Sequence, residues 1–320
     1  MARMDDIDLG VLIPIGQAQW GQGTDPRELL DFAVRAEELG YSSLRVNDFL
    51  LTPRIEALTM LAAVAPLTSR VTLGTAALLP VLRRPVQAAQ TLASIALLSG
   101  GRLVLTVGAA FPGQFGIPQH VLSDVPWERR FTRLDETAAL WRQLWAEPEG
   151  GGSFQGELLR YEQLPPMTAP FRPTGPPMWL GGASESALRR TGRRYDGWMP
   201  YPPSADRYAD GLAAVRAAAA EAGRDAAAVT PALFVSVAVT DTVERGRELL
   251  GTFAKASYGL PLDQLEQIQA LAAGPPDVVA EKLRGYVAAG ARHLMVRIAT
   301  TSLESQREQL EHIIKLKEYL

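Results

Sequence analysis

Short apolar runs alternate with longer amphipathic segments along most of the chain. Residues 71–76 form an apolar run with β-branched side chains, which predicts a buried strand. After Pro85, apolar side chains recur at helical spacing as far as Gly100-Gly101, a pair typical of a helix end. A second apolar strand follows at 103–107. This pattern predicts a right-handed strand–helix–strand crossover, the unit from which parallel sheets are built.

The same rhythm continues through the rest of the chain. Strands are predicted at residues 9–15, 43–47, 71–76, 103–107, 178–180, 196–199, 233–239 and 293–298. Helices are predicted at residues 25–39, 54–67, 85–99, 127–145, 185–194, 206–222, 243–256, 276–289 and 303–320. Eight strands alternating with helices favour an α/β (β/α)₈ TIM barrel. An open doubly wound sheet is the alternative, but it usually carries a G-x-G-x-x-G turn after its first strand, and none stands there.

Two longer segments interrupt the alternation. Residues 111–125 are rich in Gly and Pro and follow the fourth strand, a place where lids and substrate walls are common. Residues 147–177 form a second Gly/Pro-rich excursion, with a small hairpin predicted at 153–159. Because the βα rhythm resumes after it, we interpret 147–177 as an insertion between strands four and five of a single domain, 1–320. Extra helices are expected before strand eight.

Composition excludes several kinds of chemistry. The chain has no cysteine, so disulfides and thiolate ligands are excluded. A net charge of −3 gives no reason to expect nucleic acid or an anionic membrane as a partner. The N-terminus MARMDDIDLG lacks the apolar core of a signal peptide, which favours a cytoplasmic protein without a membrane span. No H-x-H or H-E-x-x-H motif occurs, so no metal site is predicted.

Barrel enzymes bind substrates at the carboxyl ends of their strands, and there the turn GGASES at 181–186 is the most informative. Its glycines allow a ligand close to the backbone, and Ser184 and Ser186 offer hydroxyls at a helix N-terminus. Exposed N–H groups and the helix dipole there favour a phosphate. A plain turn with a serine N-cap is the alternative.

Other strand ends carry candidate groups too. Asn47 and Asp48 end a strand in hydrogen-bonding groups, although an Asx turn would explain them equally well. His120 is a candidate acid or base, with a surface loop position as the alternative. Arg297 ends the eighth strand. The arginines of residues 189–194 are more typical of a solvated helix face than of an anion clamp. The small number of candidate acids and bases is typical of a site where a cofactor supplies the reactivity.

Residues 36–49, 71–110 and 176–200 together resemble the bacterial luciferase-like flavin-dependent oxidoreductases, across nearly the whole chain. The resemblance implies a (β/α)₈ barrel with an insertion region, and a homodimer. Its members use reduced FMN with oxygen as monooxygenases, or the deazaflavin coenzyme F-420 (F420) as a hydride carrier. The resemblance also implies a strand bulge with a non-prolyl cis peptide at Ala76-Ala77 behind the cofactor ring. Asn47, Asp48 and Gly108-Ala109 would flank that ring, and Gly181, Gly182, Ala183, Ser184 and Ser186 would hold the phosphate.

Two positions depart from the family pattern. Phe49 stands where many members carry His, and Phe111 stands where the family's sugar-phosphate dehydrogenases carry Glu. These aromatics argue against the dehydrogenase subgroup and leave the proton donor unassigned, with Asn47, Asp48 and His120 as candidates. They predict an apolar substrate pocket, for which Trp20, Phe49, Phe111, Trp198 and Tyr201 are candidate walls.

We therefore expect an FMNH₂-dependent monooxygenase of a hydrophobic or aromatic small molecule, supplied with reduced flavin by a separate reductase. An F420-dependent reductase is the first alternative, because the same turn and ring platform would serve both cofactors. A non-catalytic flavin-binding barrel is the second, motivated by Phe49.

Overall fold

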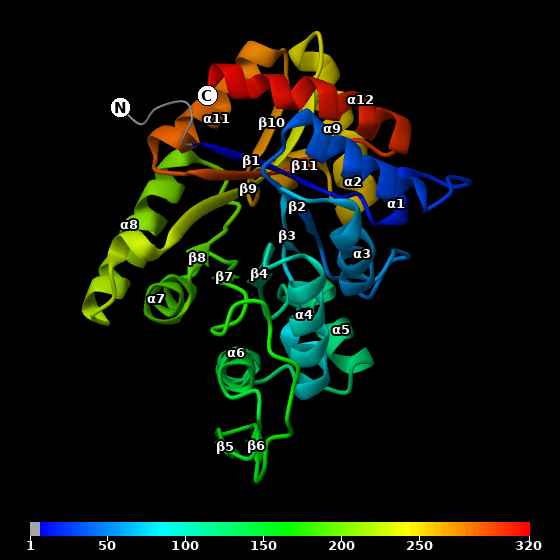
Figure 1. Cartoon of the computed structure of the whole chain (residues 1–320). Helices are drawn as coiled ribbons and strands as arrows, with labels where there is room; N and C mark the ends of the chain where they lie inside the picture. The colour runs from blue at the N-terminus through cyan, green and yellow to red at the C-terminus, as the bar shows by residue number, and fades with distance from the viewer. Residues whose placement is uncertain (1–6) are drawn as a thin grey trace.

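Eight parallel strands close into a barrel in the computed structural model, which describes residues 7–320 (Figure 1). The barrel strands are β1 (Asp8–Leu12), β2 (Ser43–Val46), β3 (Thr72–Thr75), β4 (Leu103–Val107), β7 (Met178–Leu180), β8 (Gly197–Trp198), β9 (Thr230–Val239) and β11 (His293–Ile298). Each pairs in parallel with the next, and β11 pairs with β1, so the ring has no free edge. The predicted (β/α)₈ barrel is confirmed, and the open sheet is excluded.

Helices cover the outside of the barrel. The longer ones are α2 (Glu28–Leu39), α3 (Ala57–Val64), α4 (Pro85–Leu98), α6 (Arg130–Ala146), α7 (Glu185–Arg194), α8 (Ala205–Glu221), α9 (Val243–Tyr258), α11 (Pro276–Ala288) and α12 (Leu303–Ile314). In α2 the buried residues Leu29, Phe32, Ala33 and Ala36 fall at helical spacing, so one face packs on the strands. None of the helices described is long and apolar enough to cross a membrane.

The last helix closes the ring against the first part of the chain. In Figure 1 α12 (red) lies beside α1 (Gln17–Trp20) and α2 (both blue). Arg35 of α2 pairs with Glu311 of α12 at 2.5 Å, and Arg307 pairs with Glu28 at 2.8 Å. These exposed pairs contribute little stability singly, so the main link is apolar packing between the helices and the strands.

Three short helices and one strand were not predicted. The helices α1, α5 (Ile117–Leu122) and α10 (Leu262–Glu266) lie in connecting segments, and five 3₁₀ turns lie at 65–67, 80–82, 113–115, 226–228 and 315–319. Strand β10 (Leu271–Gly274) lies between the extra helices predicted before strand eight. It pairs with the carboxyl half of β9, beyond the two residues of β9 that pair with β8. The ten-residue β9 is long enough to offer one edge to both strands.

Three predicted helix starts are corrected, and one of them is that of α6, which begins at Arg130 rather than at residue 127. Helix α2 begins at Glu28 rather than after Asp25, because the Asp25 carboxylate accepts from the Arg27 N–H and closes a turn before the helix. Helix α3 begins at Ala57, where the Glu56 carboxylate accepts from the Thr59 N–H at 2.7 Å.

The insertion at 147–177 extends away from the barrel at the bottom of Figure 1 and contains the predicted hairpin. Its strands are β5 (Phe154–Gln155) and β6 (Arg160–Tyr161), paired antiparallel. The Glu136 carboxylate of α6 accepts from three successive N–H groups in the turn, those of Glu157, Leu158 and Leu159. The hairpin is thereby fixed to the helix that precedes it.

Inside the barrel, glycines make room for large side chains. A Cβ atom at Gly74 of β3 would collide with the Val104 carbonyl and crowd the guanidinium of Arg45, and one at Gly197 of β8 would collide with the Trp179 ring. The Arg45 guanidinium lies 4.2 Å from the centre of that ring and is fully buried. A charged side chain thus occupies the middle of the barrel, below the strand ends.

Candidate active site

Asp48, just beyond β2, connects two neighbouring strand ends. Its carboxylate accepts from the Leu79 N–H at 3.1 Å, and its own N–H donates to the Ala77 carbonyl at 3.2 Å. Arg83 lies 3.1 Å from the same carboxylate and 2.7 Å from Glu56. Burial alone would lower the pKa of Arg83, but the two carboxylates outweigh it and raise the pKa. Asp48 therefore positions the segment after β3, rather than closing an Asx turn.

The segment after β3 contains the predicted bulge. Leu78 follows Gly74 by four positions, whereas their partners on β4, Val104 and Val107, are three positions apart. The Ala76-Ala77 peptide inside this bulge is cis, as the resemblance implied. A Cβ atom placed on Gly108 would lie 3.8 Å from Ala77 Cβ, in ordinary contact. Small residues from two strands therefore meet at one flat surface, which we call the platform (Ala76, Ala77, Gly108 and Ala109).

Several buried polar atoms around the strand ends have no hydrogen-bond partner within residues 7–320. They include Asn47 Oδ1 after β2, Ser236 Oγ on β9, Arg297 Nε on β11 and Thr300 Oγ1 after β11. Ser236 and Arg297 are register partners on adjacent strands, so two of these atoms come from neighbouring positions. Buried polar groups are nearly always hydrogen-bonded, so such a set indicates a place for a polar ligand or water. The contact of Asn47 with a cofactor ring stays a prediction.

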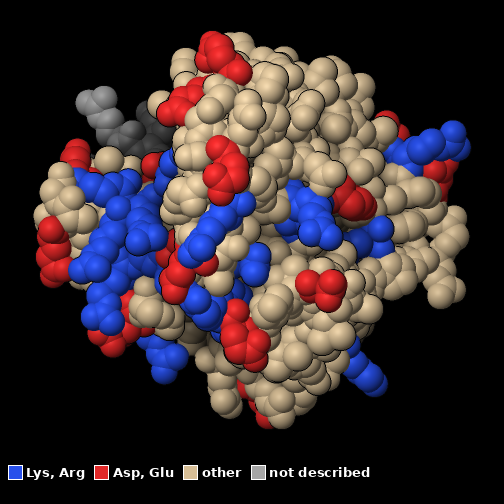
Figure 2. Space-filling model, turned by 90° about the horizontal axis from the view of Figure 1, so that it is seen from below, with Lys and Arg blue, Asp and Glu red and all other residues tan. Residues whose placement is uncertain are grey.

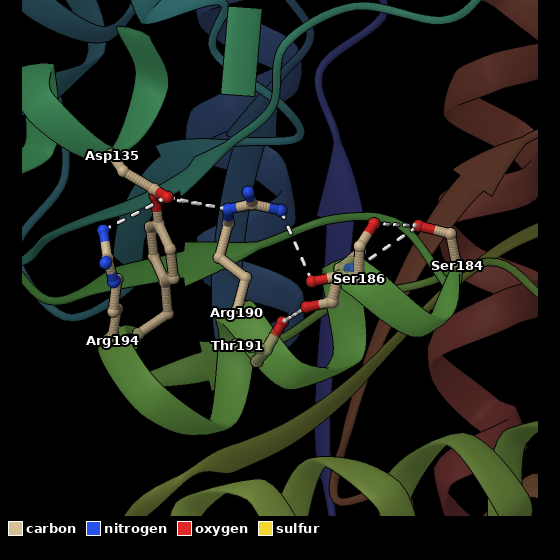
Figure 3. Close-up of polar contacts among 8 residues, drawn as sticks. Asp135, Ser184, Ser186, Arg190, Thr191 and Arg194 are labelled. Atoms are coloured by element: carbon tan, nitrogen blue, oxygen red, sulfur yellow. Dashed lines mark hydrogen bonds and ion pairs between the residues drawn. The ribbon is translucent and has the colours of Figure 1, made fainter. Parts of the chain in front are cut away.

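The turn at 181–186 connects β7 to α7 and is open to solvent at Ser184 and Ser186 (Figure 3). Ser184 Oγ accepts from the Ala187 N–H at 3.3 Å and lies 3.2 Å from Ser186 Oγ. Gly182 has a φ of +99°, which favours glycine there. The N-cap alternative is therefore seen. It leaves the hydroxyls and first N–H groups at the surface, and the phosphate site stays a prediction.

Two arginines of α7 pair with α6, and one of them, Arg190, also donates to the Ser186 carbonyl at the end of this turn (Figure 3). In Figure 3, Arg190 and Arg194 point toward Asp135 of α6, which they pair with at 2.9 and 3.2 Å. Arg189 and Arg193 are exposed, as expected for a solvated face. Basic side chains gather on the α7 and α8 side of the molecule in Figure 2, with acidic ones among them. Arg190 departs from the expectation, because it is mostly buried and ties α7 to α6.

The structure brings some of the predicted pocket residues together and separates others. Phe111 and Tyr201 form an aromatic pair with ring centres 5.4 Å apart. Burial, with Tyr258 beside it, raises the pKa of Tyr201 well above its usual range, so its hydroxyl stays protonated. Phe49 lines a cavity of about 530 Å³ with ten other residues, namely Asp48, Leu50, Leu51, Thr52, Pro53, Arg54, Glu56, Ala57, Leu82 and Arg83.

Trp198, Trp20 and His120 lie elsewhere. Trp198 faces the helices: its ring stacks on Tyr208 of α8 at 5.1 Å, and its Nε1–H donates to the Gly182 carbonyl. Trp20 is packed into the core on α1. His120 is buried on α5, with its ring edge-on to Trp127 and its Nδ1 3.3 Å from the Pro126 carbonyl. The structure does not bring these three to the platform, and their roles stay predictions.

Sequence reasoning missed Arg45 and Arg54, and it gave Arg297 no role. A signal for Arg45 was available: Ser43, Arg45 and Asn47 alternate with Leu44 and Val46 along one strand, so one face of that strand is polar. Within the described chain, no group of three or more His, Asp or Glu side chains could hold a metal ion.

Comparisons with known proteins agree with this architecture. The family model for luciferase-like monooxygenases matches residues 7–293. The chain is 29% identical to an F420-dependent glucose-6-phosphate dehydrogenase of Amycolatopsis mediterranei, over 89% of this chain and 92% of that protein. It is 32% identical to one of Nakamurella multipartita, over 84% of this chain and 86% of that protein.

Solved structures show the same fold at lower identity. An F420-dependent secondary alcohol dehydrogenase, in complex with an F420–acetone adduct, superposes with a TM-score of 0.81 at 18% identity, over 97% of this chain and 98% of that one. The monooxygenase RslO1 from Streptomyces bottropensis superposes with a TM-score of 0.80 at 19% identity, over 98% and 100%. With a family model that spans residues 7–293, the chain belongs to the luciferase-like monooxygenase family, as an oxidoreductase-type TIM barrel.

Proposed function

We propose that this protein is an F420-dependent oxidoreductase that transfers a hydride to or from a small apolar or aromatic molecule. The observation that carries the proposal is the near full-length similarity to relatives named as F420-dependent dehydrogenases. These relatives favour the F420 alternative over the FMNH₂ monooxygenase that the sequence led us to expect first. Bound deazaflavin would supply the hydride chemistry.

The site residues fit a flat, phosphorylated cofactor. The platform has almost no side-chain bulk, so a planar ring can lie against it. Asn47 Oδ1, buried without a partner in the described chain, would accept a hydrogen bond from the ring. Ser184, Ser186 and the N–H groups of their turn would hold the phosphate.

The substrate differs from that of the named relatives in this proposal. Phe49 stands where many members of the family are expected to carry His, and Phe111 stands where its sugar-phosphate dehydrogenases are expected to carry Glu. Phe111 packs against Tyr201, so this wall is aromatic. The protonated Tyr201 hydroxyl would donate a hydrogen bond to a substrate oxygen. An aromatic wall with one donor suits an apolar carbonyl compound better than a sugar phosphate.

Cofactor titration tests the proposal. Purified protein is titrated with F420 and with FMN, and turnover of reduced F420 is then followed without oxygen against a panel of aromatic ketones, enones and quinones. Tight F420 binding with anaerobic turnover is the expected result. Binding of FMN alone with oxygen consumption would restore the monooxygenase, and binding of neither by folded protein would favour the non-catalytic barrel.

A further inference from the structure

Two arginines at the mouth of the barrel have no carboxylate partner. Arg297 lies on β11, and Arg54 lies on the segment between β2 and α3. Neither forms an ion pair with Asp or Glu in the described part of the chain, although Arg83, which lines the same cavity as Arg54, pairs with both Asp48 and Glu56. The absence of a counter-ion therefore concerns these two residues and is not general to the site.

Several contacts fix the Arg297 side chain, but not all of its N–H donors have a partner among the residues described. It is 8% exposed, and its Nη1 donates to the Tyr258 hydroxyl at 2.7 Å. The Tyr258 hydroxyl in turn donates to Gln269 Oε1 at 3.1 Å. The Arg297 guanidinium lies 4.7 Å from the centre of the Phe253 ring and 5.2 Å from the centre of the Tyr258 ring. These contacts fix the plane of the guanidinium. Its Nε is buried without a partner in residues 7–320.

Arg54 presents a second guanidinium. Its Nη2 donates to Thr52 Oγ1 at 2.7 Å, whereas its buried Nε and Nη1 have no partner among the residues described. It lies 5.1 Å from the Phe49 ring and lines the cavity of about 530 Å³. Burial and, to a smaller extent, the nearby charge of Arg297 lower the pKa of Arg54 to about 10, against the opposing effect of Asp48. Arg54 is therefore charged at neutral pH.

Arg54 forms a β-bridge with Gly16, just beyond β1, and β1 pairs with β11, which carries Arg297, so both guanidiniums come from neighbouring parts of the barrel mouth. Two partly desolvated cations placed in this way are costly unless an anion joins them. The planar guanidinium matches the two oxygens of a carboxylate better than an ammonium does. Tyr258 connects this pair to the aromatic wall, since it donates to Gln269, and the N–H of the next residue, Ala270, donates to the Tyr201 carbonyl at 3.0 Å. A ligand that reaches both regions needs an aromatic or apolar body and an acidic group.

We propose that Arg54 and Arg297 bind the carboxylate of an aromatic or apolar carboxylic acid, which is the substrate class of this enzyme. The assignment of this ligand as the substrate rests on the proposed function, but the anion site itself does not depend on it. F420 also carries acidic groups, so the same two arginines could serve the cofactor, and the experiment separates the two sources.

The experiment measures binding of benzoate and of its neutral isostere benzamide by calorimetry, with and without bound F420. Wild type is compared with Arg54→Gln, Arg297→Gln and Arg297→Lys, and with Arg245→Gln as a control. Arg245 is exposed on α9 and pairs with Glu248, so its loss changes the net charge equally without touching the mouth. We expect benzoate to bind wild type at least about tenfold more tightly than benzamide.

Each glutamine substitution at the mouth should weaken benzoate binding by about 10- to 100-fold and leave benzamide unchanged. Arg297→Lys should recover part of the loss, and Arg245→Gln should match wild type. Equal binding of benzoate and benzamide to wild type would overturn the proposal, even if a variant failed to fold. It would also be overturned if the mouth variants lost F420 affinity while benzoate binding stayed the same. Intact selective benzoate binding without F420 binding would support the anion site and reject only the proposed function.

Discussion

The two sides of the barrel mouth differ in the size and charge of their side chains. On the side of β2, β3 and β4, the surface consists of Ala76, Ala77, Gly108 and Ala109, and the Asp48 carboxylate holds the backbone. On the side of β9 and β11 the surface consists of large side chains, among them Tyr258 and Arg297. The platform offers a flat surface with little side-chain bulk, whereas Arg297, together with Arg54 from the segment between β2 and α3, offers charge. We propose that the cofactor ring lies on the platform and that the two arginines bind the polar group of the substrate.

The largest expected effect comes from filling the platform. In Gly108→Leu the side chain would occupy the space next to Ala77, and F420 affinity should fall by at least about 100-fold, equivalent to about 2.7 kcal/mol. Gly108→Ala is the matched control, because its Cβ would make an ordinary 3.8 Å contact with Ala77 Cβ. Fluorescence titration with F420 measures both. Wild-type affinity in the leucine variant would place the ring elsewhere.

Arg45 tests whether an arginine without a carboxylate costs stability here. Its Nη1 donates to the Thr75 carbonyl at 3.2 Å and to Thr106 Oγ1 at 3.1 Å, but its Nε and Nη2 are buried without partners in the described chain. Burial lowers its pKa to about 9 in the folded protein, well below the ordinary value of an arginine. The cost of burying the charge is therefore present in full below pH 9, and it fades as the pH rises above about 9.

We expect Arg45→Met to raise the free energy of unfolding by about 1–3 kcal/mol at pH 7, with a smaller gain at pH 10. Denaturant unfolding at both pH values measures it. Arg102→Met is the control and should destabilise, because Arg102 donates to four backbone carbonyls and to Thr68 Oγ1. A loss of stability in Arg45→Met, with the same profile at both pH values, would contradict the argument.

On the cationic side, Tyr258→Phe removes the hydroxyl that accepts from Arg297 and donates to Gln269. Benzoate affinity should fall about fivefold, because Arg297 loses its orientation but keeps its charge. Tyr41→Phe removes another buried hydroxyl, which donates to the Leu310 carbonyl, and should leave benzoate binding unchanged. Calorimetry measures both, and an equal effect of the two substitutions would mean that only stability had changed.

The smallest effect is expected at the turn before α7. Ser184→Ala should weaken F420 binding about threefold and cost about 1 kcal/mol of stability through loss of the N-cap. Thr242→Ala removes the N-cap of α9, where Thr242 Oγ1 accepts from the Arg245 N–H, and should show the stability loss alone. Titration and thermal unfolding separate the two readouts. An unchanged F420 affinity in Ser184→Ala would remove this serine from the phosphate site.

The amino-acid pattern by itself determined the barrel and the platform side of its mouth. Strands and helices follow from local periodicity, and small residues at strand ends can be recognised without knowing what they face. The bulge and cis peptide at Ala76-Ala77 were located by resemblance, and the hairpin in the insertion by its turn residues. Strand β10 was missed, because LAAG carries no pattern of its own and pairs only because β9 extends past β8.

The charged side was decided by the tertiary structure alone. In a parallel barrel both faces of each strand are buried, so an apolar run does not tell which side chains point inward. Trp198, for example, faces the helices, whereas the next residue, Met199, packs among the residues inside the barrel. Arg297, for example, donates to Tyr258 of α9, which lies 39 residues away in the chain. Whether a cation has a counter-ion depends on which segments the closed ring brings together, and no local pattern encodes that.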